Sequence, residues 1–170
     1  MVHIKKLVIE NFKSFGGKTE IKFMDKLNLI IGPNGSGKSN ISEAISFVLG
    51  RLSKKGLRTE KLSHLIFNGG KKGKPANNSG VKIIFSNEDK VFPVEDDYVE
   101  INRRINKEGH SDYMINGKKT TRSEVINLLD YVGLSPEGFN MIMQGNIAKF
   151  VDMSSAERSE IIERISGIST

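Results

Sequence analysis

One run of eight residues constrains the fold of this chain more than any other feature. Residues 32–39 read Gly-Pro-Asn-Gly-Ser-Gly-Lys-Ser, which fits the pattern G-x-x-x-x-G-K-[ST]. At average residue frequencies, a chance match in 170 residues has odds on the order of one in a hundred. The glycines let backbone N–H groups turn inward and approach phosphate oxygens closely. The run therefore predicts a phosphate-binding loop.

The segments on either side of this loop predict a strand and a helix. Residues 27–31 form a short apolar run of the kind found in buried central strands. After the loop, apolar residues recur three and four apart over residues 41–49, which makes one face of a helix. This helix is predicted to begin near Lys38 and to stop at Gly50. A strand, a glycine-rich loop and a helix, in that order, are the context that the motif requires.

The residue types in the loop point to nucleotide chemistry. Lys38 is expected to reach the β- and γ-phosphates of a nucleotide as a point charge. The hydroxyl of Ser39 is expected to bind Mg²⁺. The positive end of the helix dipole would face the same anion. The loop alone does not name the reaction, since kinases, GTPases and ATPases share it.

The remaining sequence predicts a mixed α/β fold with an antiparallel sheet beside the nucleotide-binding core. Strands are expected at residues 4–11, 19–23 and 81–85, with a hairpin formed by residues 98–105 and 111–115. Asn116-Gly117 predicts a tight turn. A helix capped by Ser123 or a neighbour should stop near Gly133, and another should span residues 154–165. Residues 51–80 are basic and interrupted by glycine, and residues 71–79 have the composition of a loop.

Composition narrows the class of protein. The net charge of +6 and the pI near 9.5 permit binding to DNA, but they fit a mildly basic soluble surface equally well. The absence of cysteine excludes disulfides, thiolate zinc sites and cysteine nucleophiles. No apolar stretch approaches the roughly 20 residues that span a bilayer, and the start has no signal-peptide pattern. We therefore expect a cytoplasmic protein with no membrane partner.

Several segments together resemble one family. They read ENFKSF at residues 10–15, GPNGSGKSN at 32–40, AISFVLG at 44–50, LIFNG at 65–69, MIMQGNI at 141–147 and IERISGI at 162–168. This combination closely resembles the N-terminal head segment of SMC (structural maintenance of chromosomes) proteins of the prokaryotic or archaeal type. The resemblance implies a P-loop NTPase fold, specifically the N-terminal lobe of an ABC-type ATPase head. Residues 1–170 would be that lobe, and a coiled coil would begin near residues 160–170.

The resemblance also assigns roles to individual residues. Lys38 and Gln144 would be catalytic, while Ser39 and Gln144 would bind Mg²⁺. Lys61 and Arg122 match positions that face DNA in the family. The nucleotide-binding set would comprise Lys13, Ser14, Asn34, Gly35, Ser36, Gly37, Lys38, Ser39, Asn40, Arg58, His64, Leu65, Ile66 and Gln144. The catalytic glutamate and the signature motif of the family are not in this sequence.

The implied activity needs more than this lobe. Joined by a C-terminal lobe, an SMC head dimerises with a second head on ATP, hydrolyses it, and drives chromosome condensation and segregation. A kleisin-type subunit and double-stranded DNA would be further partners, at the nucleoid in the cytoplasm. By itself the lobe is expected to bind nucleotide poorly or not to turn it over. The alternative is a head lobe of a zinc-hook or RecF/RecN-type DNA-repair ATPase. A transporter's ABC domain is disfavoured, because residues 116–168 hold no LSGG-like element.

Overall fold

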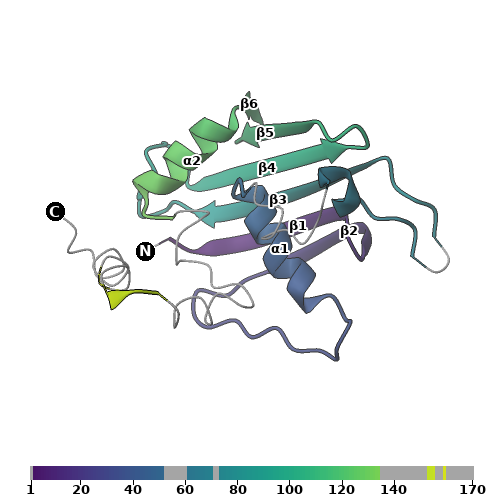
Figure 1. Ribbon diagram of the computed structural model, residues 1–170. Coiled ribbons are helices and arrows are strands. Elements are labelled where there is room, and N and C mark those ends of the chain that lie inside the picture. The colour runs from purple at the N-terminus through teal and green to yellow at the C-terminus, as the bar shows by residue number, and fades with distance from the viewer. Residues whose placement is uncertain (1, 52–60, 71–72, 135–152, 156–158, 160–170) are drawn as a thin grey trace.

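The computed structural model describes residues 2–51, 61–70, 73–134, 153–155 and 159. Its described strands form one sheet in the order β2-β1-β3-β4-β5-β6, and every neighbouring pair is antiparallel (Figure 1). The strands are β1 (Ile4–Phe12), β2 (Phe15–Lys22), β3 (Asn78–Ser86), β4 (Tyr98–Asn106), β5 (Ser111–Ile115) and β6 (Lys118–Thr120). The predicted antiparallel sheet is thus confirmed. Each predicted strand outside residues 27–31 is present, β5 with the predicted bounds and the others with different ends.

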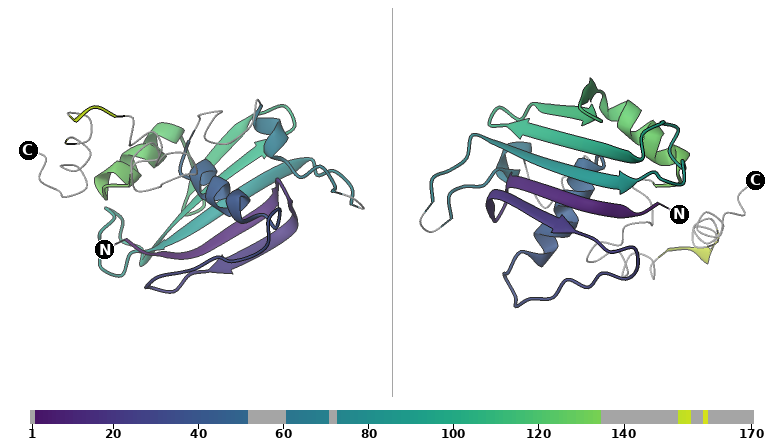
Figure 2. Two further views of the ribbon diagram at one scale, coloured as in Figure 1. Left: turned by 60° about the horizontal axis from the view of Figure 1, so that its bottom comes forward. Right: turned by 180° about the vertical axis from the view of Figure 1, so that it is seen from behind.

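Helices cover one face of this sheet. The α-helices of the described part are α1 (Lys38–Val48) and α2 (Arg122–Tyr131), and η1 (Leu62–Leu65) is a short 3-10 helix. Seen from behind, the strands lie in front of α1 and α2, so both α-helices pack on the same side (Figure 2). Among the described residues, none of the helices has the length and hydropathy needed to cross a membrane. The buried residues of α1 are the apolar Ala44, Phe47 and Val48 together with the polar Glu43 and Ser46.

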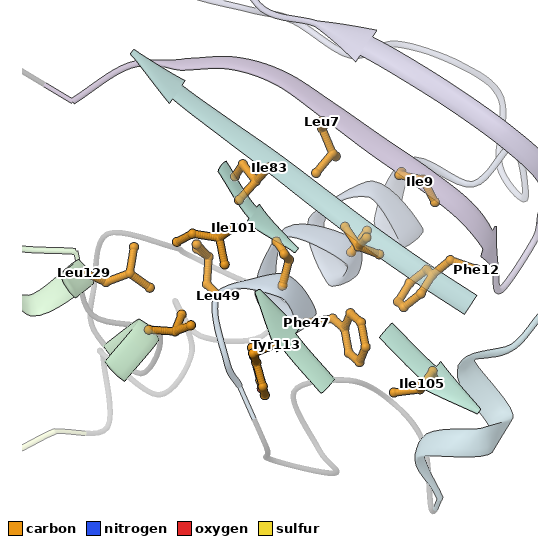
Figure 3. Close-up of a cluster of buried hydrophobic side chains, with 14 of the residues drawn as sticks. Leu7, Ile9, Phe12, Phe47, Leu49, Ile83, Ile101, Ile105, Tyr113 and Leu129 are labelled. Atoms are coloured by element: carbon orange, nitrogen blue, oxygen red, sulfur yellow. The ribbon is translucent and has the colours of Figure 1, made fainter. Parts of the chain in front are cut away.

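The hydrophobic core lies between the sheet and α1. Leu7 and Ile83 face each other on the neighbouring strands β1 and β3, and both are fully buried. The ring of Phe47 on α1 packs against that of Phe12 at the end of β1, with centroids 5.4 Å apart (Figure 3). Burying such a side chain stabilises the fold by roughly 1.5–3 kcal/mol relative to leaving it exposed. The core thus fixes α1 against β1.

The turns follow the local sequence signals. Asn116 and Gly117 both have positive φ angles, 46° and 77°, and join β5 to β6 as the tight turn predicted for this pair. Helix α2 is capped by Thr121, whose side chain accepts from the Glu124 amide in a complete capping box. Hydrogen bonds from Thr120 first, and then from Thr121, lower the pKa of the Glu124 carboxyl. The helix ends before Gly133, as predicted.

The predicted buried strand at residues 27–31 is wrong. The segment has no strand assignment, and the exposed fractions of Leu27, Leu29 and Ile31 are 92%, 81% and 82%. It lies between β2 and α1 and runs away from the sheet (Figure 1). Its local order comes from Asn28, which binds both the amide and the carbonyl of Met24. A central strand needs a hydrogen-bonding neighbour on each side, and no described strand pairs with this segment.

Part of the predicted structure cannot be compared. Most of the helix expected over residues 154–165 lies outside the described residues, as does much of the basic stretch that begins at residue 51.

Candidate functional site

The glycine-rich loop leads directly into α1. Gly35 and Gly37 have φ angles of 79° and 95°, in the left-handed region where other residues are strained. A Cβ atom on Gly37 would also lie 3.1 Å from the Ser14 hydroxyl oxygen. Glycine at residue 37 is thus required both by the backbone angle and by the close approach of the β1–β2 turn.

The start of α1 is free of acidic groups from its own sequence. Gly37 is the N-cap and provides no side-chain hydrogen bond, and the first turn holds no acidic residue. The first N–H groups of a helix have no intrahelical acceptor, and the helix dipole places partial positive charge there. Residues 34–36 are exposed and Gly37 is half-buried. The arrangement therefore favours an anion such as phosphate.

Lys38 folds its ammonium group back over the loop. The Nζ atom donates to the carbonyl oxygens of Gly32 and Pro33 at 2.6 and 2.8 Å. Ser39, the next residue, is exposed at the beginning of α1. The two residue types expected to hold phosphate and Mg²⁺ therefore stand together at one end of the helix.

The turn between β1 and β2 adds a second cation to this end of α1. Lys13 has a φ of 50°, and its amide donates to the Leu65 carbonyl at 2.6 Å. Its ammonium group forms an ion pair with Glu43 of α1, whose side chain is almost completely buried. The hydroxyl of the next residue, Ser14, accepts a hydrogen bond from the side-chain amide of Asn40 at 2.7 Å. The structure thus brings Lys13, Ser14 and Asn40 beside the loop.

The other end of α1 is held by arginines from distant parts of the chain. Arg103 of β4 is fully buried and donates to the carbonyls of Phe47 and Arg51 at 2.8 and 3.1 Å. Its guanidinium also stacks 4.1 Å from the centre of the Phe47 ring. Burial lowers the pKa of Arg103 to about 10, so the group stays charged at neutral pH. Arg122 donates to the Gly50 carbonyl at 2.7 Å. Positive charge at this end complements the helix dipole.

Glu43 and Arg103 were not predicted from the sequence. Glu43 is a charged residue between apolar positions of the helix, and that position inside an amphipathic pattern is the signal that could have indicated a buried pair. Arg103 lies in β4 at the alternation expected for an inward-facing residue, with Ile101 and Ile105 two residues away on each side. The partners of neither residue can be read from sequence spacing.

The remaining predicted site residues are placed differently. Leu65 and Ile66 belong to the core, next to Phe12, whereas His64 and Lys61 are exposed. Arg122 is half-buried through its contact with Gly50. Arg58 and Gln144 lie outside the described residues.

A groove of about 390 Å³ lies on the sheet face opposite α1. Alternating residues of β1 to β4 line it, and their charges pair with each other. The pairs are Lys82 with Glu100, Arg104 with Glu10, and Lys6 and Lys18 with Glu20. This groove is separated by the sheet from the phosphate loop and has little net charge.

Comparison with known proteins identifies the family. A model of the RecF/RecN/SMC N-terminal domain matches residues 3–161. The chain belongs to this family. It is 47% identical to the chromosome partition protein Smc of Pyrococcus furiosus over 99% of its own length, and it spans 14% of that relative. The predicted resemblance to SMC proteins is therefore confirmed.

Solved SMC heads have the same fold. One is the P. furiosus Smc head domain with an extended coiled coil, bound to the C-terminal domain of ScpA. It matches with a TM-score of 0.93 and 47% identity, over 99% of this chain and 42% of that one. Another comes from work on ATP-driven dimerisation and DNA-stimulated activation of SMC ATPases, with a TM-score of 0.88, 46% identity, and 96% and 99% coverage.

RecF, a recombination mediator, is more distant. Its TM-score is 0.57 at 24% identity, over 74% of this chain and 30% of that one, which shows the fold alone. The predicted fold class, an N-terminal lobe of a P-loop ABC-type ATPase head, is confirmed by the SMC heads.

Proposed function

We propose that this chain is the nucleotide-binding lobe of an SMC head, which binds ATP and Mg²⁺ through its phosphate loop. The observation that carries the proposal is the start of α1. A glycine N-cap without acidic neighbours stands there beside Lys38, whose ammonium group is held by loop carbonyls. A β- or γ-phosphate offers that ammonium a stronger, charged acceptor than the two carbonyls.

Several residues of the chain would contact different parts of the nucleotide. Asn34 to Asn40 would surround the phosphates, with Lys38 on the β- and γ-phosphates and Lys13 and Ser14 near the adenine and α-phosphate. Arg58, His64, Leu65 and Ile66 would complete the nucleotide contacts. Mg²⁺, when bound, neutralises phosphate charge, and the hydroxyl of Ser39 and the amide of Gln144 are its proposed ligands. Gln144 would in addition sense the γ-phosphate.

The lobe is proposed to need a C-terminal lobe for hydrolysis. The support is the exposed apolar run at residues 27–31, which has the composition of a central strand but pairs with no strand among the residues that the structure describes. A strand from a second lobe would pair with this run and cover its side chains. The same lobe would supply the signature motif and the catalytic glutamate, which this sequence lacks. A coiled coil would begin near residues 160–170.

The larger assembly follows from the family. Two such heads would dimerise on ATP, a kleisin-type subunit would bind the head, and the assembly would act on double-stranded DNA in chromosome condensation and segregation. Lys61 and Arg122 are the proposed DNA contacts, in a cytoplasmic, nucleoid-associated protein. The second candidate, a zinc-hook or RecF/RecN-type repair ATPase, is disfavoured because the identity to Smc proteins is about twice that to RecF.

The decisive experiment measures MgATP binding and turnover by this chain, alone and mixed with a separately made C-terminal lobe. We expect turnover only in the mixture and its loss on Lys38→Ala. Turnover by the chain alone would show that a complete catalytic site lies within these residues, which would overturn the split-head proposal. Binding that is equal for Lys38→Ala and the unchanged chain would overturn the proposed phosphate site.

A further inference from the structure

Glu43 is an unusual residue for the helix on which it lies. It is a carboxylate with 1% of its surface exposed, on a helix whose first turn is arranged for an anion. Glutamate is rarely buried so completely unless it is paired. One of its partners is the ammonium group of Lys13, whose side chain is 16% exposed. A buried ion pair is by itself weak evidence of a stabilising role, so the pair calls for an explanation other than helix stability.

The pair lies close to the phosphate loop. Glu43 follows Ser39 by four residues, and residues at this spacing are neighbours on one helix face. The turn that carries Lys13 is fastened to the same helix by the hydrogen bond between Ser14 and Asn40. The Lys13 amide is held by the Leu65 carbonyl. The main chain of Lys13 is therefore fixed, and the position of its ammonium group depends on which anion it contacts.

We propose that Glu43 is a positioning residue that holds the Lys13 ammonium group before nucleotide binds and then competes with the nucleotide phosphate for it. This inference rests on the proposed function, in which Lys13 contacts the nucleotide. Glu43 thereby keeps Lys13 next to the loop at the expense of nucleotide affinity. The carboxylate sets how tightly the head holds nucleotide, for ATP and ADP alike, because the α-phosphate is common to both.

The test is the substitution Glu43→Gln, which keeps the shape of the side chain and removes its charge. In the chain joined by its C-terminal lobe, we expect the Kd for both MgATP and MgADP to fall by roughly tenfold, in the range of typical coupling between two sites. The thermal midpoint without nucleotide is expected to fall as well, because a buried ion pair is broken. Calorimetry gives the first quantity and thermal unfolding the second. A residue that only stabilises the fold would leave the Kd unchanged or raise it.

Two controls separate a direct effect from a general one. Glu20→Gln removes the same charge from the opposite face of the sheet, and its Kd should equal that of the unchanged chain. In a Lys13→Met background, Glu43→Gln should no longer tighten binding, because the contested cation is gone. Tightening that persists without Lys13, or that Glu20→Gln reproduces, would overturn the proposal.

A shorter carboxylate covers the case in which Glu43→Gln does not fold. Glu43→Asp withdraws the charge from Lys13 by one methylene group, and we expect the Kd to fall by less than it does for Glu43→Gln. An unchanged or higher Kd in a folded variant overturns the role of Glu43. The proposed function survives such a result if the joined protein binds nucleotide and its Lys38→Ala variant does not. If the joined protein without substitutions binds no nucleotide, the proposed function and the role of Glu43 are both overturned.

Discussion

At the scale of single residues, α1 is held at its two ends by cations that do different work. Lys38 stands at the beginning of the helix beside the loop, and the ammonium group of Lys13 pairs with Glu43 of the same helix. Arg103 and Arg122 stand at the other end and donate to the carbonyls of Phe47 and Gly50, in and just after the last turn. The buried guanidinium of Arg103 therefore stabilises the helix that carries the phosphate loop, at the end away from the phosphate site.

Arg103 is expected to be a strong determinant of stability. Arg103→Ala removes hydrogen bonds to the carbonyls of Phe47 and Arg51 and leaves a cavity between Phe47 and Tyr113. Together these effects should lower the free energy of unfolding by about 3–5 kcal/mol. Urea denaturation measures the change. Arg104→Ala is the matched control, because its side chain lies on the opposite face of the same strand, and it should cost less than about 1 kcal/mol.

At the scale of elements, the sequence predicted those features that are determined by residues close together in the chain. The alternation of apolar residues in β1, β3 and β4 and the Asn116-Gly117 turn are readable because each is set within a few residues. The ion pair of Lys13 with Glu43 joins residues 30 positions apart, and the contact of Arg103 with Phe47 joins residues 56 apart. Such pairings depend on the order of the strands in the sheet. The pattern of apolar and polar residues does not predict that order.

The cap of α2 offers a test at this scale. The sequence allowed Ser123 or a neighbour as the cap, and the structure selects Thr121. Thr121→Ala removes the oxygen that accepts from the Glu124 amide and should destabilise the lobe by about 1 kcal/mol. Ser123→Ala, two residues into the helix, should change the free energy of unfolding by less than about 0.5 kcal/mol. Equal effects of the two substitutions in chemical denaturation would contradict the assigned cap.

At the scale of the whole molecule, the same reasoning explains the one strand that was predicted wrongly. The apolar run at residues 27–31 fits a central strand, and the chain places it at the edge of its own structure with Leu27, Leu29 and Ile31 exposed. The apolar pattern indicates a buried environment for these residues, and the described part of the chain does not provide one. This run leads directly into the phosphate loop. If a strand of a second lobe paired with it, that pairing would therefore also influence the position of Lys38.

Leu29→Ser with Ile31→Ser tests this coupling. Because both side chains are exposed in this lobe, the substitutions should change its free energy of unfolding by less than about 0.5 kcal/mol. If a C-terminal lobe buries them, each should cost about 1.5–3 kcal/mol of binding, so the affinity of the double variant for that lobe should fall at least about 100-fold. Calorimetric titration of the two lobes measures this loss of affinity.

Lys22→Ser, a polar change at the end of β2, is the control and should leave the affinity unaltered. A large loss of stability in the lobe alone would mean that the run is already packed within it, and an unchanged affinity for the second lobe would mean that it serves another surface.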